Sequence, residues 1–177
     1  REGLKWFVSI QTEFEIESKR IINSEIGIDM GVKKFVTFSN RTFVEPVNSL
    51  KNHLKQLAKL QKKLSRQQKG SNNSKKTKAK ITKLHRRIAN IRRDFLHKNT
   101  TTIAKNHGIV FMEDLKASNM SASASGTVEQ PGKKVRQKSG LNRSILDQGW
   151  FSFKTMLAYK LEEREGSVSY THLRAHE

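Results

Sequence analysis

The sequence predicts an α/β fold, in which strands near residues 26–39 and 108–115 form a mixed sheet and a helical stretch connects them. Two observations lead to this prediction. Runs rich in β-branched and aromatic residues, typical of strands, occur on both sides of residues 50–106. Between them, apolar residues recur every three or four positions, which is the period of a helix that packs along one face.

The composition indicates an anionic partner. The 177 residues include 35 Lys+Arg against 16 Asp+Glu, a formal net charge of +19. Nucleic acid is the partner that such a charge fits best. No run approaches the ~20 apolar residues of a membrane span, so a membrane partner is a minor alternative and is not expected. Because the chain has no cysteine and no secretory signal, we expect an intracellular protein.

The first segment, residues 6–16, alternates apolar and polar residues toward its end, as a half-buried strand does. A lone strand needs partners, and the chain opens at Arg1 rather than at methionine. We therefore expect residues 1–22 to be the end of a preceding β-domain, with the N-terminus truncated.

A β-hairpin is predicted next, with strands over 26–32 and 34–39 joined by a tight turn. Alternation places Asp29 between Gly27 and Gly31 on one face of the first strand. Such an aspartate can coordinate a metal ion and admit a phosphate, because no side chain on its strand blocks the approach. A surface aspartate beside a turn is the alternative interpretation.

The helical stretch predicts an antiparallel hairpin over about 49–106, interrupted by the polar residues 69–74. Residues 51–98 contain 17 Lys+Arg and the single acid Asp94, so pairing along the helices cannot neutralise the charge. We expect this surface to lie against phosphate backbones. A structural hairpin that assembles with a protein partner is an alternative. The apolar stripes are Leu50, Leu54, Leu57, Leu60, Leu64 and Ile81, Leu84, Ile88, Ile91, Phe95.

The strand predicted over 108–115 is continuously apolar and ends on Glu113 and Asp114, which favours burial on both faces. If it runs parallel to the Asp29 strand, the helical hairpin is a sufficient crossover. Adjacent strands lie ~5 Å apart, so Asp29 and Glu113 could hold metal together. The alternative is that Glu113 and Asp114 only mark the solvent-exposed end of a core strand.

Residues 116–140 have the composition of a mobile basic loop, suited to a lid or a substrate contact. A helix capped by Asn142 or Ser144 is expected to follow. We interpret Trp150 and Phe151 as core residues, and Gln148 and Lys154 as possible phosphate contacts. The predicted apolar stripe of this helix is Leu146, Trp150, Phe153, Leu157 and Leu161.

The last segment, residues 167–177, matches nothing that precedes it. It resembles the translated sequencing-adapter tail found at the ends of open reading frames from metagenomic assemblies. We therefore expect it to be non-native. His172 and His176 have the i, i+4 spacing of zinc ligands on a helix, but we assign them no role for this reason.

Taken together, these segments resemble the TnpB/OrfB family of insertion-sequence proteins over roughly residues 5–166. The similarity rests on the order of residues 27–37, the basic hairpin, residues 109–116, and Asn119-Met120. It implies an RNase H-like (RuvC) mixed sheet with flanking helices and an inserted basic helical hairpin. Residues 1–22 would then end a wedge-like β-domain, and residues 23–166 would form a partial nuclease domain.

The resemblance also implies a function, that of a transposon-encoded, RNA-guided DNA endonuclease with guide RNA and target DNA as partners. It further implies a location, the cytoplasm of a bacterium or archaeon. Asp29 and Glu113 match two catalytic, metal-holding carboxylates of a two-ion Mg²⁺ site, whereas Asp114 matches no catalytic position. The third aspartate and the four-cysteine zinc ribbon of the family have no counterpart here, so this chain alone should be inactive. The alternative is a non-catalytic nucleic-acid-binding module. The basic residues expected to contact nucleic acid are Lys33, Lys34, Lys62, Lys63, Arg66, Lys83, Arg86, Arg87, Arg92 and Arg93.

Overall fold

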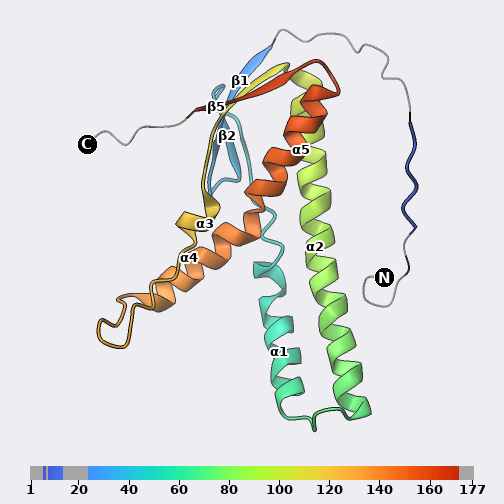
Figure 1. The fold of residues 1–177 in the computed structure, drawn as a ribbon, viewed down its shortest axis with the longest axis vertical. Coiled ribbons are helices and arrows are strands. Elements are labelled where there is room, and N and C mark those ends of the chain that lie inside the picture. Colours follow the sequence, from blue (N-terminus) through green and yellow to red (C-terminus); the bar gives the residue numbers. More distant parts are fainter. Residues whose placement is uncertain (1–5, 7, 14–23, 172–177) are drawn as a thin grey trace.

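The computed structural model describes residues 6, 8–13 and 24–171 and contains one five-stranded mixed sheet with helices on one side (Figure 1). The strand order is β3-β2-β1-β4-β5. The α/β class predicted from the sequence is thus confirmed. The strands are β1 (Glu25–Met30), β2 (Val36–Phe38), β3 (Phe43–Val44), β4 (Ile109–Glu113) and β5 (Ser167–Thr171). The helices are the 3₁₀ turn η1 (Lys51–His53), α1 (Leu54–Ser65), α2 (Asn72–Asn106), α3 (Ala117–Met120), α4 (Val135–Gln148) and α5 (Trp150–Glu162).

The β-hairpin forms as predicted, and β1 pairs with β2 in antiparallel register. Ile26, Ile28 and Met30 are buried on one face of β1, as their alternation requires. β4 lies on the other side of β1 and runs parallel to it, with Ile26 opposite Val110. The predicted crossover through the helical hairpin is therefore confirmed.

The helical hairpin consists of α1 and α2, which project together beyond the body of the protein (Figure 1). Ser71 caps α2, because its hydroxyl accepts a hydrogen bond from the backbone N–H of Ser74. Leu57, Leu84 and Ile88 form a small core between the two helices. The last turns of α2 instead join the main core, where Leu96 and Ile103 are buried; the hairpin therefore continues into the body.

The sheet is covered on one face only within the described residues. Helix α5 packs there, and its Phe153, Leu157 and Leu161 are fully buried. On the opposite face Phe111 of β4 is 36% exposed, so the prediction that this strand is buried on both faces is wrong. Apolar residues on both faces of β4 could not reveal from sequence alone which face is covered.

The region after β4 differs from the prediction. The expected loop contains the short helix α3 and the first turns of α4, which begins at Val135 rather than near residue 141. Asn142 lies inside α4, and its amide donates hydrogen bonds to the backbone carbonyls of Ser121 and Ala122 instead of capping a helix. The Ser- and Gly-rich composition concealed these contacts, because they join residues about 20 positions apart.

The single helix predicted beyond residue 141 is broken in two at Gly149, which has a left-handed φ of 71°. This break changes which side chains face the core. Trp150 is buried as predicted, but Leu146 is 60% exposed and Phe151 is 77% exposed, so placing these two in the core was wrong. One continuous helical stripe cannot describe two helices with different axes.

The two ends of the described chain also bear on the predictions. No strand forms at residues 8–13, where part of the first strand was expected; residues 7 and 14–16 lie outside the described residues. Residues 167–171 form β5, which pairs in parallel with all five residues of β4. They therefore fit the sheet, and their non-native origin stays a prediction. His172 and His176 lie outside the described residues. None of the described helices is long and apolar enough to span a membrane.

Candidate paired-carboxylate site

Asp29 and Glu113 lie on neighbouring strands at the carboxyl edge of the parallel pair. The register of β1 and β4 places Gly27 opposite Phe111 and Ile28 opposite Met112, so Asp29 and Glu113 follow side by side. Because Ile28 and Met112 point into the core, alternation directs both carboxylates to the open face of the sheet. Neighbouring strands are ~4.8 Å apart, so the two side chains are within reach of one ion.

Both carboxylates line one shallow groove on the open face, with a volume of about 440 Å³. Thr37 of β2 lies directly opposite Asp29 in the antiparallel register and lines the same groove. The groove is lined by Gly27, Ile28, Asp29, Thr37, Phe38, Ser39, Phe111, Met112, Glu113 and Thr171.

Neither carboxylate has a compensating partner within the described residues. The three ion pairs found there involve other acids, and no side-chain hydrogen bond reaches Asp29 or Glu113. Two adjacent carboxylates repel each other, and a bound cation relieves that repulsion. Among the described residues no group of three or more His, Cys, Asp or Glu side chains is arranged to hold a metal. The described part of the chain thus supplies a pair of candidate ligands and no more.

The two glycines beside Asp29 have local roles as well. A Cβ on Gly27 would lie 3.3 Å from Cβ of Ser39, whose hydroxyl accepts a hydrogen bond from the Gly27 N–H at 3.1 Å. A Cβ on Gly31 would lie 3.0 Å from the carbonyl oxygen of Lys34 in the turn. Close packing of the hairpin therefore explains both glycines. Ser39 fills part of the space beside Gly27 that the strand pattern predicts to be open.

Asp114 is directed away from the pair. Its carboxylate forms an ion pair with Lys154 of α5, on the covered side of the sheet. The resemblance assigns Asp114 no catalytic position, and the ion pair gives this residue a structural contact. It also engages Lys154, which was predicted to be a phosphate contact. Gln148, the other such candidate on these helices, is 5% exposed and donates to the carbonyl of Ser144, so a phosphate contact by Gln148 is ruled out.

Most of the predicted basic residues are presented by the helical hairpin. Between α1 and α2 lies an open groove of about 500 Å³ with a floor of Leu60, Leu84 and Ile91. Gln56 and Asn90 contribute amides to it, and its basic rim consists of Lys80, Lys83, Arg86 and Arg87. Lys62, Lys63, Arg66, Lys83, Arg87 and Arg93 are exposed, whereas Arg86 is half-buried.

Arg92 makes a structural contact that the sequence did not predict. Its guanidinium forms an ion pair of 2.7 Å with Asp147, whose side chain is only 5% exposed. An arginine so engaged helps to hold the fold, and a phosphate contact by Arg92 stays a prediction. Its partner lies 55 positions further along the chain, beyond the reach of any local pattern.

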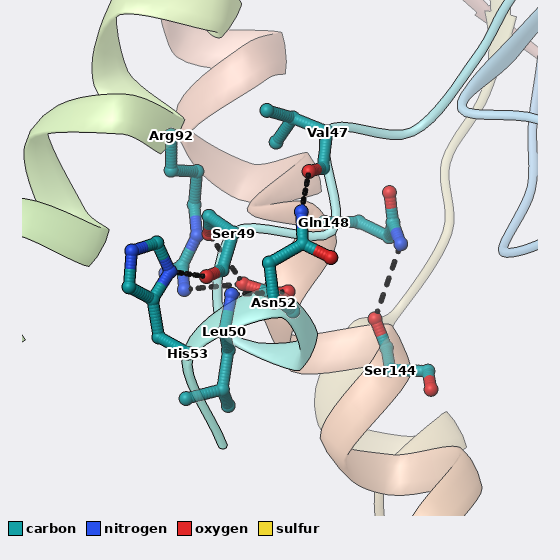
Figure 2. Close-up of polar contacts among 9 residues, drawn as sticks. Val47, Ser49, Leu50, Asn52, His53, Arg92, Ser144 and Gln148 are labelled. Atoms are coloured by element: carbon teal, nitrogen blue, oxygen red, sulfur yellow. Dashed lines mark hydrogen bonds and ion pairs between the residues drawn. The ribbon is translucent and has the colours of Figure 1, made fainter. Parts of the chain in front are cut away.

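The Asp147 carboxylate joins three segments, and its partners Ser49, Leu50 and Arg92 lie close together in Figure 2. Besides Arg92 of α2, it accepts hydrogen bonds from the hydroxyl of Ser49 at 2.8 Å and from the backbone N–H of Leu50 at 2.9 Å. The ring of His53 bonds the Ser49 carbonyl at 2.8 Å. Asp147 at the end of α4 therefore fixes the start of the helical hairpin. No local pattern in the sequence points to Asp147; Gly149, a residue type that often ends helices, is the one nearby sign of a junction.

Lys33 and Lys34 flank the turn after Asp29. Lys33 is exposed, while Lys34 places its ammonium 3.6 Å from the ring centroid of Phe43 on β3. Lys34 therefore helps to hold β3 against the hairpin, and nucleic-acid contacts by Lys33 and Lys34 stay predictions.

The geometry defines an α/β protein with a paired-carboxylate groove and basic helical projections. Residues 8–124 match the family OrfB_IS605, described as "Probable transposase". The chain belongs to this family, which confirms the recognition made from the sequence.

Named relatives agree with that assignment. An Escherichia coli K12 protein named "Putative RNA-guided DNA endonuclease InsQ" is 56% identical over 165 residues, which are 93% of this chain and 41% of that protein. A Streptomyces pristinaespiralis protein named "Putative RNA-guided DNA endonuclease" is 33% identical over 88% of this chain and 35% of its own length. A protein of Mycobacterium tuberculosis H37Rv is 27% identical over 90% of this chain and 35% of its own length. The chain thus spans well under half the length of these relatives.

Proposed function

We propose that the complete protein containing this chain is a transposon-encoded endonuclease that cleaves DNA under the guidance of RNA, with Asp29 and Glu113 among its catalytic carboxylates. The observation that carries this proposal is the placement of the two acids. They are adjacent, share one groove on an uncovered sheet face, and lack a cationic partner within the described residues although the chain has a net charge of +19. The relatives' names supply the reaction class.

The donor types fit Mg²⁺, the metal that we propose for this site. Carboxylate oxygens are the hard ligands that Mg²⁺ prefers, and Asp29 and Glu113 would hold it. When bound at such a site, metal ions activate the attacking water and stabilise the leaving oxygen. Because two carboxylates hold an ion more loosely than three, we expect this chain by itself to cleave little or no DNA.

The sheet supports an RNase H-like (RuvC) assignment within this proposal. An antiparallel hairpin is extended by two parallel strands, and the acids stand at the carboxyl edge of the parallel pair. Exposed Lys and Arg of the helical hairpin would contact the phosphates of the guide RNA and the target DNA. Such contacts orient the nucleic acids, while base pairing between RNA and DNA supplies the sequence specificity.

The test is cleavage of a matched DNA by the complete protein loaded with its RNA. Asp29→Asn and Glu113→Gln should each lower the rate by at least about 100-fold, and EDTA should abolish cleavage, because charge stabilisation by the metal is lost. Glu25→Gln is the matched control: Glu25 lies on the same strand at the amino edge, and its variant should cleave normally. Normal cleavage by both site variants would refute the proposal.

A non-catalytic binding module is the second candidate function. It is favoured by a separate observation, the 17 Lys+Arg against one acid over residues 51–98, which needs no carboxylate site. In that case the complete protein would bind RNA or DNA with the same affinity in Mg²⁺ and in EDTA at matched ionic strength, and it would cleave neither.

A further inference from the structure

A second basic projection leaves the sheet next to the carboxylate pair. We name residues 117–148 the α3–α4 arm; it contains α3, the connection after it, and α4. The arm begins four positions after Glu113, at the carboxyl edge of β4. Figure 1 shows α4 extending away from the sheet, with the connection between α3 and α4 at its far end. A strand of nucleic acid that reaches Glu113 from this side would pass along the arm.

Hydrogen bonds across the arm give it a defined shape. The Lys138 ammonium donates to the carbonyl of Met120 at 2.8 Å, and the Asn142 amide donates to the carbonyls of Ser121 and Ala122. These carbonyls lie at the end of α3 and just beyond it, where backbone groups need external donors. The outgoing chain is thereby attached to α4. At the root of the arm, Asp147 is bonded to α2 and to the start of the helical hairpin.

Basic residues outnumber acids in the arm. It carries five Lys or Arg residues against two acids, Glu129 and Asp147, and Asp147 is already paired with Arg92. Lys133, Arg136 and Arg143 are exposed, and none of the three forms an ion pair with an acid in the described parts of the chain. Uncompensated cations on a narrow projection favour a polyanion as the partner.

We propose that the α3–α4 arm binds the phosphate backbone of the DNA strand to be cut and leads it to Asp29 and Glu113. This inference rests on the proposed function and adds a contact surface distinct from the helical hairpin. DNA is favoured over the guide RNA because the arm starts beside the acids, where the strand undergoing cleavage must lie. Lys and Arg contacts to phosphates give affinity and direction without reading bases.

The first test measures binding of a labelled single-stranded DNA by this chain over a range of salt concentrations. For single strands, each phosphate contact adds about 0.7 to the magnitude of the negative slope of log affinity against log salt. The triple variant Lys133→Ala, Arg136→Ala, Arg143→Ala should therefore reduce that magnitude by about 2. The matched control, Arg41→Ala, Lys105→Ala, Arg164→Ala, removes the same charge from exposed or half-exposed sites at the amino edge of the sheet. It should leave the slope nearly unchanged. Equal losses in both triples, or no loss in the arm triple, would overturn the proposal.

The second test identifies the nucleic acid, using the complete protein with its RNA and target DNA. Gly140 lies between Arg136 and Arg143 on one face of α4, and a Cβ built there meets no atom within 4 Å. A photo-crosslinking residue at this position should crosslink to the DNA strand that is cut, whereas the same residue at Asn106, at the opposite edge, should not. Crosslinking to RNA alone, or to neither strand, would refute the assignment to DNA.

The two proposals fail in different ways. If the complete protein cleaves its target and the arm triple cleaves and binds like the unaltered protein, the arm has no such role while the proposed function stands. If the unaltered protein fails to cleave DNA in Mg²⁺, the proposed function fails whatever the arm binds.

Discussion

Replacing Asp147 by alanine should destabilise the protein more than its position near a helix end suggests. The substitution removes the acceptor of three hydrogen bonds, from Ser49, Leu50 and Arg92, at 2.7–2.9 Å. It also leaves the Arg92 guanidinium without its counter-ion. Breaking a buried ion pair costs roughly 3–5 kcal/mol, and we expect the lower end, about 3 kcal/mol, because the Arg92 side chain is 28% exposed and recovers some water.

Urea unfolding of the chain, followed by circular dichroism, measures this loss. The variants Asp147→Ala, Arg92→Met and the double substitution form a cycle that isolates the coupling of the pair. We expect the double variant to be more stable than the sum of the single losses predicts, since no unpaired charge then remains. A loss below about 1 kcal/mol for Asp147→Ala, or additive losses in the cycle, would refute the view that Asp147 joins the helical hairpin to α4.

Three further predictions concern packing and charge. Gly149→Ala should cost about 1–3 kcal/mol and lower Tm, because φ is 71° and the added Cβ would lie 3.1 Å from Cδ of Arg92; an unchanged Tm would contradict this. Phe153→Ala should lower the free energy of unfolding by about 3–5 kcal/mol because Phe153 is fully buried. Phe151→Ala should lower it by less than about 0.5 kcal/mol because the Phe151 side chain is 77% exposed. Similar losses in the two variants would contradict the helix break. Burial lowers the pKa of Lys160 below 10.5, and the opposing effect of Glu163 is smaller. Just below that pH the unfolded chain therefore binds more protons than the folded chain, so the stability of the unaltered protein should rise with pH relative to that of Lys160→Met. Parallel pH profiles of the two proteins would contradict this prediction.

The strands and the helical hairpin could be predicted from the sequence because their signals are local. Alternation over Ile26, Ile28 and Met30 fixed the face of β1, and continuous apolarity marked β4. If the two strands are parallel neighbours, their carboxyl ends lie at the same edge of the sheet, and Asp29 and Glu113 are therefore adjacent. The structure thus confirms where the two acids lie, which depends on period and strand direction, while their role as metal ligands stays a prediction.

The features that were missed depend on contacts between distant residues. Nothing near Arg92 in the sequence distinguishes it from the other basic residues of α2, and only folding brings Asp147 to it. The extent of α4 was missed for the same reason, since Lys138 and Asn142 are tied to the end of α3 and just beyond it. Composition alone described this segment as a loop.

Phe151 illustrates a third kind of error, in which a single backbone angle decides the outcome. A continuous helix would have kept the predicted stripe together, but the left-handed Gly149 turns the axis before Trp150. The sequence contains the glycine without stating whether it ends a helix or lies within one. Phe151 is therefore exposed although its neighbour Trp150 is buried.

The most direct test of the central claim is Mn²⁺ binding to this chain, measured by electron paramagnetic resonance as a spectroscopic substitute for Mg²⁺. If Asp29 and Glu113 hold one ion together, the unaltered chain should bind Mn²⁺ and either Asp29→Asn or Glu113→Gln should weaken binding at least about tenfold, because each carboxylate supplies charge and a hard oxygen. Glu25→Gln should bind as the unaltered chain does. Equal binding by all four proteins would contradict the account.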